Sequence, residues 1–419
     1  MGQGHQRGRH RNAIGRRRGQ GPRSIMAGRQ LRIDPMASRK PFAARKTAPR
    51  PPQGGRKASR GQSVRHLLAG NQLRQSLLIA QPASVRVALV AGLQAGLAIF
   101  VALVSAHLSP WPHLVGFSAL GGLAALFGRF ASAQGRQRIV MVCGLLLVAG
   151  VLVPSLATYA GAGALSMVLL LALSAGLYTL AVWRWGLTGG PGAVIFVFAV
   201  GAALAPVDSA AAVVERTLAT AWGALVAWLA CALTDRLRPH GAVAMAAAPL
   251  PPLSLQLMVA GRIAVGAGAA ALIIFWAGWQ YPAWAAIGAA AVMQGTHLHL
   301  TMNRSLQRMA GTIVGACIVW AILAQDPSFW TLVAAVVLCQ VITEVTIGFN
   351  YALGQVTVTP MALLMTYMAS PAPASNMPVE RVVDTIVGAA IGIVFAVIFS
   401  TVDDRVHLAR RYRKLRIWR

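Results

Sequence analysis

Apolar runs that are long enough to cross a lipid bilayer recur along this chain from about residue 87 to its end. A helix needs about 20 mostly apolar residues to span the hydrocarbon core, and backbone groups in lipid must be satisfied within the segment. The chain has 419 residues, of which 11% are charged, and its mean hydropathy is +0.60, whereas soluble domains carry about 25% charged residues. The predicted fold class is therefore an all-α membrane protein.

Twelve candidate spans follow an N-terminal segment of 84 residues. They cover residues 87–107, 113–129, 139–157, 163–183, 189–206, 213–234, 262–279, 281–295, 307–324, 328–347, 349–369 and 381–402. The second and eighth spans are short, and the sequence leaves open whether they cross fully.

Basic residues are distributed unevenly. Of the 38 Lys and Arg, 20 lie in residues 1–86 and 7 in residues 405–419. If the N-terminus is cytoplasmic, the remaining loop arginines fall in inside loops, and outside connections such as "HLSPWPH" and "TYAGAG" hold no Lys or Arg. This agrees with the positive-inside rule. We expect a multi-pass protein of the bacterial inner membrane with both termini cytoplasmic.

The N-terminal segment, residues 1–84, is rich in Arg, Gly, Gln, Ser and Pro. Such a composition cannot bury a core, and it predicts a disordered basic tail. The tail, like the basic tail at 403–419, could contact anionic lipid, or it could simply be solvated. Translation starting at Met26 or Met36 is a further alternative. Because no aromatic residues interleave with the arginines, nucleic acid is not an expected main partner.

A repeated motif divides the membrane region. The sixth span starts "ERTLATAWGA" at Glu215, and the twelfth starts "ERVVDTIVGA" at Glu380, 165 residues later. The shared pattern is E-R-x-x-x-T-x-x-G-A. It predicts two repeats of six helices, 85–235 and 262–402, joined by a cytoplasmic linker at 236–261. An even number of spans gives both repeats the same orientation.

The second repeat resembles the fusaric acid resistance and aromatic acid exporter family. The resemblance rests on "YPAWAAIGAAAVMQ", "RSLQRMAGTIVGACI", "FNYALGQVTVTPMALLM" and "ERVVDTIVGAAIG". It covers about residues 262–402, with a weaker echo across 85–235, where Ala219 stands at the place of Asp384. The resemblance implies an exporter of organic, often aromatic, carboxylates that is driven by the proton gradient.

Arg216 and Arg381 occupy the same register in the two repeats. Ionisable residues in spans usually face a bundle interior or a watery cavity, so the pair could bind an anionic substrate facing the axis between the repeats. In the alternative, Glu380 favours the helix dipole and Arg381 neutralises Asp384 one turn away. Asp384 is also a candidate proton-coupling residue.

Two prolines lie at matching places in the repeats, Pro191 among glycines and Pro360 in "VTVTPM". Proline removes a helical hydrogen bond, and Thr357 and Thr359 could cover the freed groups. Interrupted helices in both repeats are a sequence pointer to a transport site. We therefore predict Pro191, Thr357, Thr359 and Pro360 as substrate-site residues, with a packing kink as the alternative.

Glu344 is the acidic residue placed well within a span, in "LCQVITEVTIGFNYA". A carboxyl group there could carry a proton in exchange for substrate, so Glu344 is the second proton-coupling candidate. It lies about one turn from the predicted cytoplasmic end, and a near-interface acid is the alternative.

Other motifs indicate structure rather than chemistry. Three GxxxG pairs, Gly92/Gly96, Gly311/Gly315 and Gly388/Gly392, predict close helix contacts. The four cysteines stand alone in apolar runs, and the HxH of His297 and His299 lacks a third metal ligand. No phosphate-binding loop or nucleophile motif appears. The sequence thus predicts no metal, no cofactor and no enzyme activity.

The leading functional hypothesis is an inner-membrane secondary transporter that exports small organic acids in exchange for protons. A passive organic-anion channel, which distant plant relatives of the family suggest, is the first alternative. A membrane anchor or assembly factor acting through the basic tail is the second. The substrate's identity and the formation of a homo-oligomer stay open.

Overall fold

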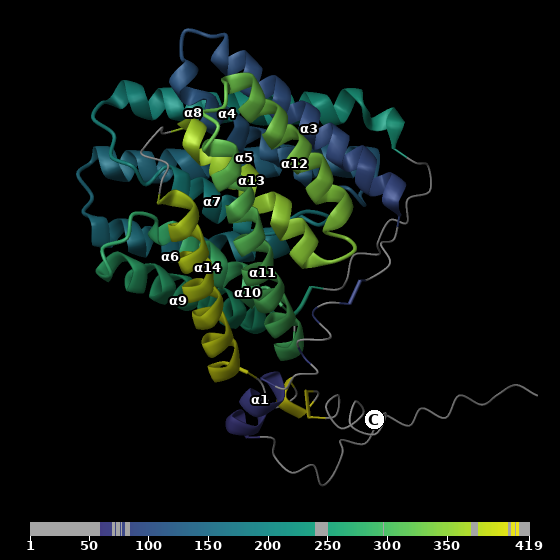
Figure 1. Ribbon diagram of the computed structural model, residues 1–419, viewed down its shortest axis with the longest axis vertical. Coiled ribbons are helices and arrows are strands. Elements are labelled where there is room, and N and C mark those ends of the chain that lie inside the picture. The colour runs from purple at the N-terminus through teal and green to yellow at the C-terminus, as the bar shows by residue number, and fades with distance from the viewer. Residues whose placement is uncertain are drawn as a thin grey trace, which may run out of the picture. The chain divides into compact units, whose positions relative to one another are not determined.

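The computed structural model of the chain describes residues 59–68, 72, 76, 78, 79, 84–238, 250–295, 297–369, 376–400, 404–406, 408 and 409. The chain divides into two compact units, Met1–Gly54 and Gly55–Arg419, and every element below belongs to the second. Its regular elements are helices, and the described residues contain no strand (Figure 1). The predicted all-α class is confirmed.

The helices fall into two sets of six, separated by residues 234–252. The first set comprises α3 (Val85–His107), α4 (Val115–Gly122, flanked by 3-10 turns η1 at Pro112–Leu114 and η2 at Leu123–Leu126), α5 (Ala133–Tyr159), α6 (Ala164–Arg184), α7 (Val194–Ala202) and α8 (Ala210–Leu233). The second set comprises α9 (Leu253–Trp276), α10 (Pro282–Met293), α11 (Leu298–Leu323), α12 (Phe329–Thr346), α13 (Tyr351–Ala369) and α14 (Met377–Ile398).

Nine of the described helices are long and apolar enough to cross a membrane, namely α3, α5, α6, α8, α9, α11, α12, α13 and α14. Serine caps fix where four of them begin. Ser84, Ser132, Ser209 and Ser328 each accept a hydrogen bond from a backbone N–H in the first turn, at 3.1 to 3.3 Å. A serine oxygen in this position satisfies one of the N–H groups that has no partner within the helix.

The prediction of a full helical span at 189–206 is wrong. Only Val194–Ala202 is helical, and nine residues of helix are about 14 Å long. Gly189 and Gly192 hold positive φ angles of 75° and 76°, and Pro191 between them cannot donate a backbone hydrogen bond. The preceding residues therefore leave the helical conformation.

Three predicted spans begin too late. Helix α9 begins at Leu253 rather than at 262, so its first turns occupy part of the predicted linker 236–261, and α11 begins at Leu298 rather than at 307. Helix α5 likewise begins at Ala133. In each case the predicted span begins near an arginine, whereas the observed helix begins several residues before that arginine. Arginine can lie within such a helix because its stem packs along apolar surface.

The predicted disordered tail at 1–84 contains a helix. Helix α1 (Arg60–Leu67) begins at Ser59, which forms a capping box with Gln62. Leu67 is buried in a small cluster with Leu298, Met302 and Val397. Residues 1–58 and most of the tail at 403–419 lie outside the described residues, so their predicted disorder is not tested.

Two short helices form the centre of the two sets. Every residue from Leu114 to Gly128 is buried, and so is every residue from Ala283 to Met293. A helix that is apolar on all sides suits the interior of a protein or lipid, and here the burial shows that protein surrounds it. Helix α4 packs against α3 and α8, while α10 packs against α9 and α14. The second and eighth predicted spans are therefore enclosed by the longer helices.

Glycines let the backbones of these helices touch. A Cβ atom added at Gly388 would collide with the carbonyl oxygen of Ala285 on α10, and one at Gly223 would collide with that of Ser118 on α4. These two glycines are the shared glycine of the E-R-x-x-x-T-x-x-G-A motif. Gly92, Gly96, Gly311, Gly315 and Gly392 also lie against neighbouring helices. The predicted close contacts at the GxxxG pairs are confirmed.

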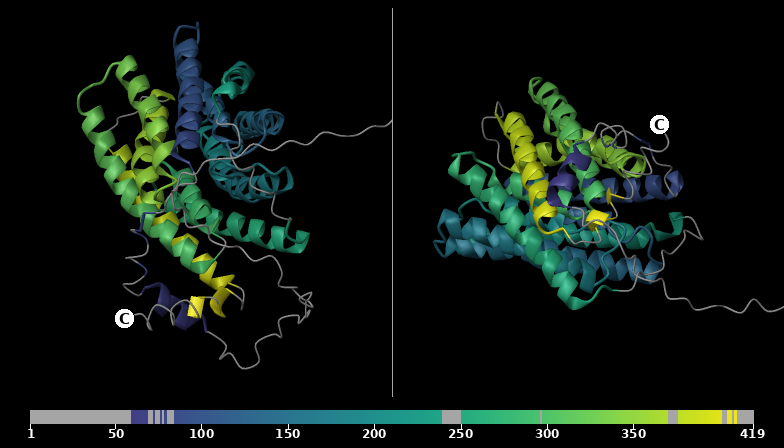
Figure 2. Two further views of the ribbon diagram at one scale, coloured as in Figure 1. Left: turned by 90° about the vertical axis from the view of Figure 1, so that its right-hand side faces the viewer. Right: turned by 90° about the horizontal axis from the view of Figure 1, so that it is seen from below.

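The two sets of helices contact each other through reciprocal pairs. Helix α3 of the first set packs against α12 of the second, and α6 of the first packs against α9 of the second. Figure 2 shows α3 beside the green helices of the second set and α9 beside the blue-green helices of the first. Helices α7 and α10 also pack together, as do α4 and α13.

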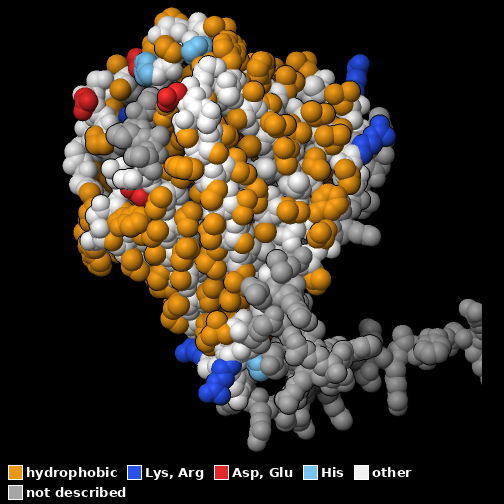
Figure 3. All heavy atoms as spheres, in the orientation of Figure 1, with side chains coloured by type: hydrophobic (Ala, Val, Ile, Leu, Met, Phe, Trp, Pro, Cys, Tyr) orange, Lys and Arg blue, Asp and Glu red, His pale blue; other side chains and the backbone are white. Residues whose placement is uncertain are grey.

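The outer faces of the long helices carry large apolar side chains. Leu89, Leu93 and Leu97 of α3 are 42%, 54% and 44% exposed, at a helical spacing that points them outward. Figure 3 shows a face that is mostly hydrophobic, with Lys and Arg at its lower and right-hand edges and Asp, Glu and His mainly toward the upper left. This is the surface of a membrane protein, apolar in the middle and charged at the ends.

Two glycine substitutions should have opposite effects on stability. Gly388→Ala places a methyl group against the backbone of α10 and should cost about 1–3 kcal/mol through overpacking. Gly261→Ala on α9, where nothing lies within 4 Å, should gain up to about 1 kcal/mol from helix propensity. Thermal unfolding of the two purified variants in detergent checks this. Equal melting temperatures would contradict the packing.

Candidate transport site

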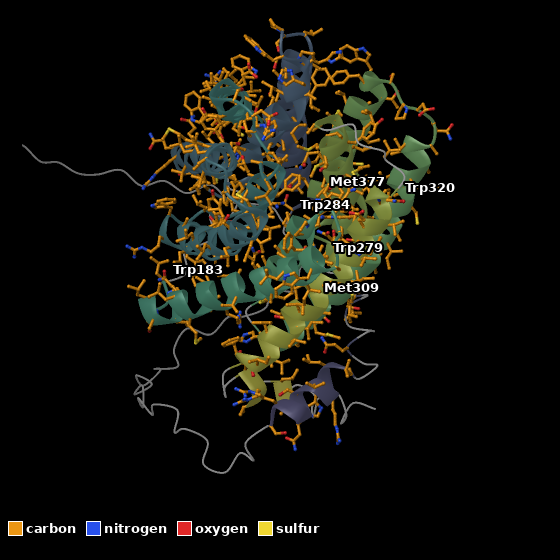
Figure 4. The ribbon with its side chains drawn as sticks, turned by 90° about the vertical axis from the view of Figure 1, so that its left-hand side faces the viewer. Trp183, Trp279, Trp284, Met309, Trp320 and Met377 are labelled. Carbon is orange, nitrogen blue, oxygen red and sulfur yellow. The ribbon has the colours of Figure 1, made fainter. Side chains whose placement is uncertain are left out.

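The two motif arginines each lie over an aromatic ring in their own set of helices. The guanidinium carbon of Arg381 on α14 is 5.2 Å from the ring centre of Trp284 on α10, and that of Arg216 on α8 is 5.3 Å from Phe117 on α4. Cations over aromatic faces are attracted by the ring quadrupole. Figure 4 marks Trp284 near Met377, the first residue of α14. The arginines therefore hold equivalent but separate positions.

The two arginines differ in burial and in partners. Arg216 is half-buried and donates hydrogen bonds to the carbonyl oxygens of Ala205 and Pro206, at 3.0 and 3.4 Å. Arg381 is 3% exposed, and its Nε has no hydrogen-bond partner. Arg216 thus binds the backbone of the loop between α7 and α8. Arg381 is in the interior, and its Nε–H has no acceptor among the described residues.

Arg381 belongs to a buried cluster of ionisable side chains. Asp384 is fully buried, Arg308 on α11 is 2% exposed, and both lie within electrostatic range of Arg381. Arg308 donates to the hydroxyl of Tyr351 at 3.1 Å and to the amide oxygen of Gln355 at 3.3 Å. Among the described residues, Arg381 and Asp384 form no ion pair, and neither carboxylate oxygen of Asp384 has a hydrogen-bond partner. The expected neutralisation within α14 is therefore not seen.

Such unpaired groups are costly in the interior. A buried polar group without a partner loses its hydration and gains nothing in return. Native structures keep such groups where a ligand, a proton or a water molecule supplies the missing partner. The cluster of Arg308, Arg381 and Asp384 can accordingly take up an anion at the guanidinium groups or a proton at the carboxylate.

The prediction of an interrupted helix at Pro360 is wrong. Helix α13 runs without a break from Tyr351 to Ala369. The carbonyl freed by the proline is that of Val356, and it lies against Gly315 of α11, where an added Cβ would be only 2.9 Å away. Because Gly315 has no side chain, α11 packs closely against α13 at Pro360. Helix α13 therefore continues through the proline without an interruption.

The two predicted threonines lie around this proline. Thr357 donates to the carbonyl oxygen of Gly354 at 3.1 Å and contacts Thr343 of α12 at 2.7 Å. Thr359 is fully buried and lies 3.5 Å from the hydroxyl of Thr312. Both residues lie at contacts between helices, and their assignment to a substrate site stays a prediction.

The segment around Pro191 is interrupted, and it crosses between the two ends of the helices. Helix α6 ends near the start of α5. This follows from a hollow that is lined both by Trp185 and Gly186, after α6, and by Gly135 and Arg138 in the first turns of α5. Helix α8 begins near the opposite end, where Glu215 lies 3.6 Å from His113. Between these points only α7 is helical. The carbonyl oxygens of this crossing need partners from elsewhere.

Arg129 supplies one of those partners. Its Nε donates to the carbonyl oxygen of Gly189 at 2.9 Å, and its Nη1 lies 3.0 Å from a carboxylate oxygen of Glu344. The side chains of Arg129 and Glu344 are 16% and 6% exposed. Arg129 thus joins the interrupted segment of the first set to α12 of the second. Glu344 is thus paired with a cation, and its assignment as a proton-coupling residue or as a near-interface acid stays a prediction.

Further polar contacts surround this ion pair. Arg136 is 1% exposed and donates to Gln94 at 2.5 Å, and Gln94 donates in turn to Thr234. Arg238 donates to the carbonyl oxygens of Arg129 and Ala131, while its other nitrogen pairs with Asp235 at 2.9 Å. These residues form a network at the predicted cytoplasmic end, centred on Arg129.

Sequence reasoning missed Arg129 as a site residue because it counted only as an inside-loop charge. A signal was present: Arg129 follows a fully apolar segment and precedes a serine-capped helix, so its side chain starts close to the interior. Its partner could not be read from the sequence, since Glu344 is 215 positions away. The described residues contain no group of three His, Cys, Asp or Glu that could hold a metal ion.

A cavity of about 480 Å³ lies elsewhere, between α6, α9 and the ends of α10 and α14. Arg262, Arg304, Gln294 and Trp183 are among its lining residues. None of the predicted site residues lines it, although Gly192, next to Pro191, does.

Comparison with known proteins finds a family that resembles part of the second set of helices. Residues 269–395 match the family described as "Fusaric acid resistance protein-like". The chain is fusaric acid resistance-like over this stretch. The resemblance predicted from the sequence is thereby confirmed. The fusaric acid resistance-like segment contains Trp284, Arg308, Glu344, Arg381 and Asp384, whereas Arg129 and Arg216 lie before it.

One curated relative is the uncharacterized membrane protein YvaC of Bacillus subtilis (strain 168), which is 36% identical over 111 residues. The match covers 26% of this chain and 18% of that relative. No solved structure matches the chain. These findings support a multi-pass membrane protein with a fusaric acid resistance-like segment.

The Arg129–Glu344 pair makes a stability prediction. Glu344→Met leaves Arg129 buried without its counter-charge and should destabilise the protein by about 3 kcal/mol. The double variant Arg129→Met/Glu344→Met should be more stable than Glu344→Met alone, because no lone charge remains buried. Melting temperatures of the purified variants measure this. A double variant less stable than either single variant would contradict a simple ion pair.

Proposed function

We propose that this protein is a secondary transporter of the bacterial inner membrane that exports small organic acids, in particular aromatic carboxylates, in exchange for protons. The observation that carries the proposal is the buried cluster of Arg381, Asp384 and Arg308, with hydrogen-bonding atoms that no described residue satisfies. Ionisable groups this deep in a membrane protein are retained for function more often than for stability. The fusaric acid resistance-like segment contains all three residues.

The chemistry of the cluster suits a carboxylate. Arginine presents a planar fork of donors that matches a carboxylate, and Arg381 has a free Nε. Trp284 beneath Arg381 and Tyr281, stacked on it at 4.1 Å, make the surroundings of this cluster aromatic, which suits an aromatic ligand. Arg216 holds the equivalent place in the first set, and we assign it a secondary role because its donors already bind two carbonyl groups.

Two carboxylates are candidates for proton coupling. Asp384 stands beside Arg381 without an ion-pair partner among the described residues, so it can bind a proton when the anion leaves. Protonation of Glu344 would instead break its pair with Arg129 and release the segment at Gly189 and Pro191. The two protonation events have different consequences. Protonation of Asp384 acts at the proposed substrate position, whereas protonation of Glu344 acts on the backbone segment at Gly189 and Pro191.

The transporter has two repeats in this proposal. The packing of α4 on α8 and of α10 on α14, and the reciprocal pairs α3–α12 and α6–α9, support a parallel arrangement related by an axis along the membrane normal. Thr357, Thr359 and Pro360 then support the second repeat around Gly315, and Pro191 shapes the matching segment of the first. The Lys and Arg distribution supports cytoplasmic termini, with the basic tails near anionic lipid.

The test is uptake of labelled benzoate by inside-out vesicles with an acidic lumen. Wild-type protein should accumulate benzoate above equilibrium, and Arg381→Gln should reduce uptake at least tenfold while still inserting. Asp384→Asn should allow benzoate to equilibrate but not to accumulate, because the proton site is gone. Arg184→Gln, an exposed arginine at the end of α6, should behave as wild type.

The same assay separates the alternatives. Uptake by wild type that only equilibrates, with or without the pH gradient, would indicate the passive anion channel. Uptake unchanged by Arg381→Gln would remove the cluster from the substrate path. Activity that requires residues 1–58, tested by their deletion, would favour the membrane anchor.

A further inference from the structure

The cavity of about 480 Å³ between α6, α9 and the end of α10 contains none of the residues assigned above to transport. We propose that it is an access site, where an aromatic carboxylate binds from the cytoplasmic side before it reaches the buried cluster. This inference rests on the proposed function and adds to it a second binding position with its own residues.

The lining fits a small aromatic ligand. It is mostly apolar with a few polar groups, which is the usual composition of small-molecule sites, and its volume lies within their range of about 300–1,000 Å³. Trp183 from α6, marked in Figure 4, and Phe399 after α14 contribute aromatic surface. Met258, Val259 and Ile263 of α9 and Met293 of α10 complete the apolar wall.

The charges in the cavity favour an anion. Arg262 and Arg304 contribute two positive charges, and Asp404 contributes one negative charge. Asp404 also lies 3.1 Å from His297, so one negative charge faces two positive ones in the lining. The site therefore keeps a net positive charge for a ligand.

Arg262 is the anchor for the carboxylate. It is half-buried on α9, where one terminal nitrogen donates to the carbonyl oxygen of Met293 at 3.1 Å. Its Nε is buried and has no hydrogen-bond partner in the part of the chain that the structure describes. The bond to Met293 fixes the guanidinium at the cavity wall and leaves donors for an incoming oxygen.

The start of α7 forms another part of the wall. Gly192 and Ala193 line the cavity, and Ala193, the N-cap of α7, makes no side-chain capping bond. An uncapped helix N-terminus favours a negative group. An added Cβ at Gly192 would lie 3.1 Å from Gln294, so glycine keeps this wall open to the amide. A bound carboxylate would thus touch the interrupted segment that Arg129 holds.

The test measures binding of labelled benzoate to the purified full-length protein in detergent by scintillation proximity. In an Arg381→Gln background, which disables the buried cluster, Arg262→Gln should weaken the remaining binding at least tenfold, and Arg262→Lys should recover part of it by restoring the charge. Met258→Trp, which leaves Arg262 intact but fills the cavity, should also weaken binding. Neutral benzamide should not compete.

Arg138→Gln is the matched control, because Arg138 lines a separate hollow of about 280 Å³ at the same predicted end. It should bind benzoate as wild type does. In vesicles, Arg262→Gln should raise the benzoate concentration at half-maximal uptake and largely keep the maximal rate, since the buried cluster is intact.

The outcomes separate the two proposals. Unchanged benzoate binding in both Arg262→Gln and Met258→Trp, with transport lost in Arg381→Gln, overturns the access site and leaves the exporter standing. Benzoate binding that depends on Arg262, without any transport by wild type, supports the site and overturns the exporter. Absence of saturable binding by wild type overturns the access site.

Discussion

A backbone that leaves the helical conformation inside a membrane protein must find partners for its polar groups, and here Arg129 provides one of them. Its guanidinium binds the carbonyl oxygen of Gly189 in the segment before α7 and pairs with Glu344 on α12. One side chain therefore stabilises the interrupted crossing and fastens the first set of helices to the second. The two arrangements depend on each other, because losing Glu344 leaves the charge that holds Gly189 without a counter-ion.

The candidate cluster at Arg381 has a different physical character. Arg129 is matched by an acid and a carbonyl oxygen, whereas Arg381 has an aromatic ring as its neighbour and an unused donor. Arg129 has an ion-pair partner, and Arg381 has none among the described residues. This contrast is why the proposed substrate position is at Arg381 and not at the more exposed Arg216, whose donors bind Ala205 and Pro206.

Much of the helical plan follows from the sequence. Apolar length places α12 and α13 within two residues, and the motif glycines Gly223 and Gly388 mark close contacts between helix backbones. Hydropathy predicted the wrong helix starts near charged residues, as at Arg262 in α9. An arginine can lie within a helix span when another helix offers a carbonyl acceptor, and that acceptor cannot be read from hydropathy. The sequence also predicted that both prolines interrupt a helix. The helix continues through Pro360, where Gly315 of the neighbouring helix leaves room, whereas Pro191 lies outside a helix between two glycines with positive φ angles. The pairing of Arg129 with Glu344 needed the fold.

The enclosed helices α4 and α10 have a consequence for assembly. With its two 3-10 turns, Pro112–Leu126 amounts to 15 residues, and Pro282–Met293 has 12, so neither reaches the roughly 20 residues needed to span lipid alone. Neither can be stable in the bilayer before the helices around it are present. During biogenesis each short segment must therefore stay out of contact with lipid until α8 or α14, which are synthesised later, pack against it. The last helix of each set is in this sense the step that commits the set to its folded state.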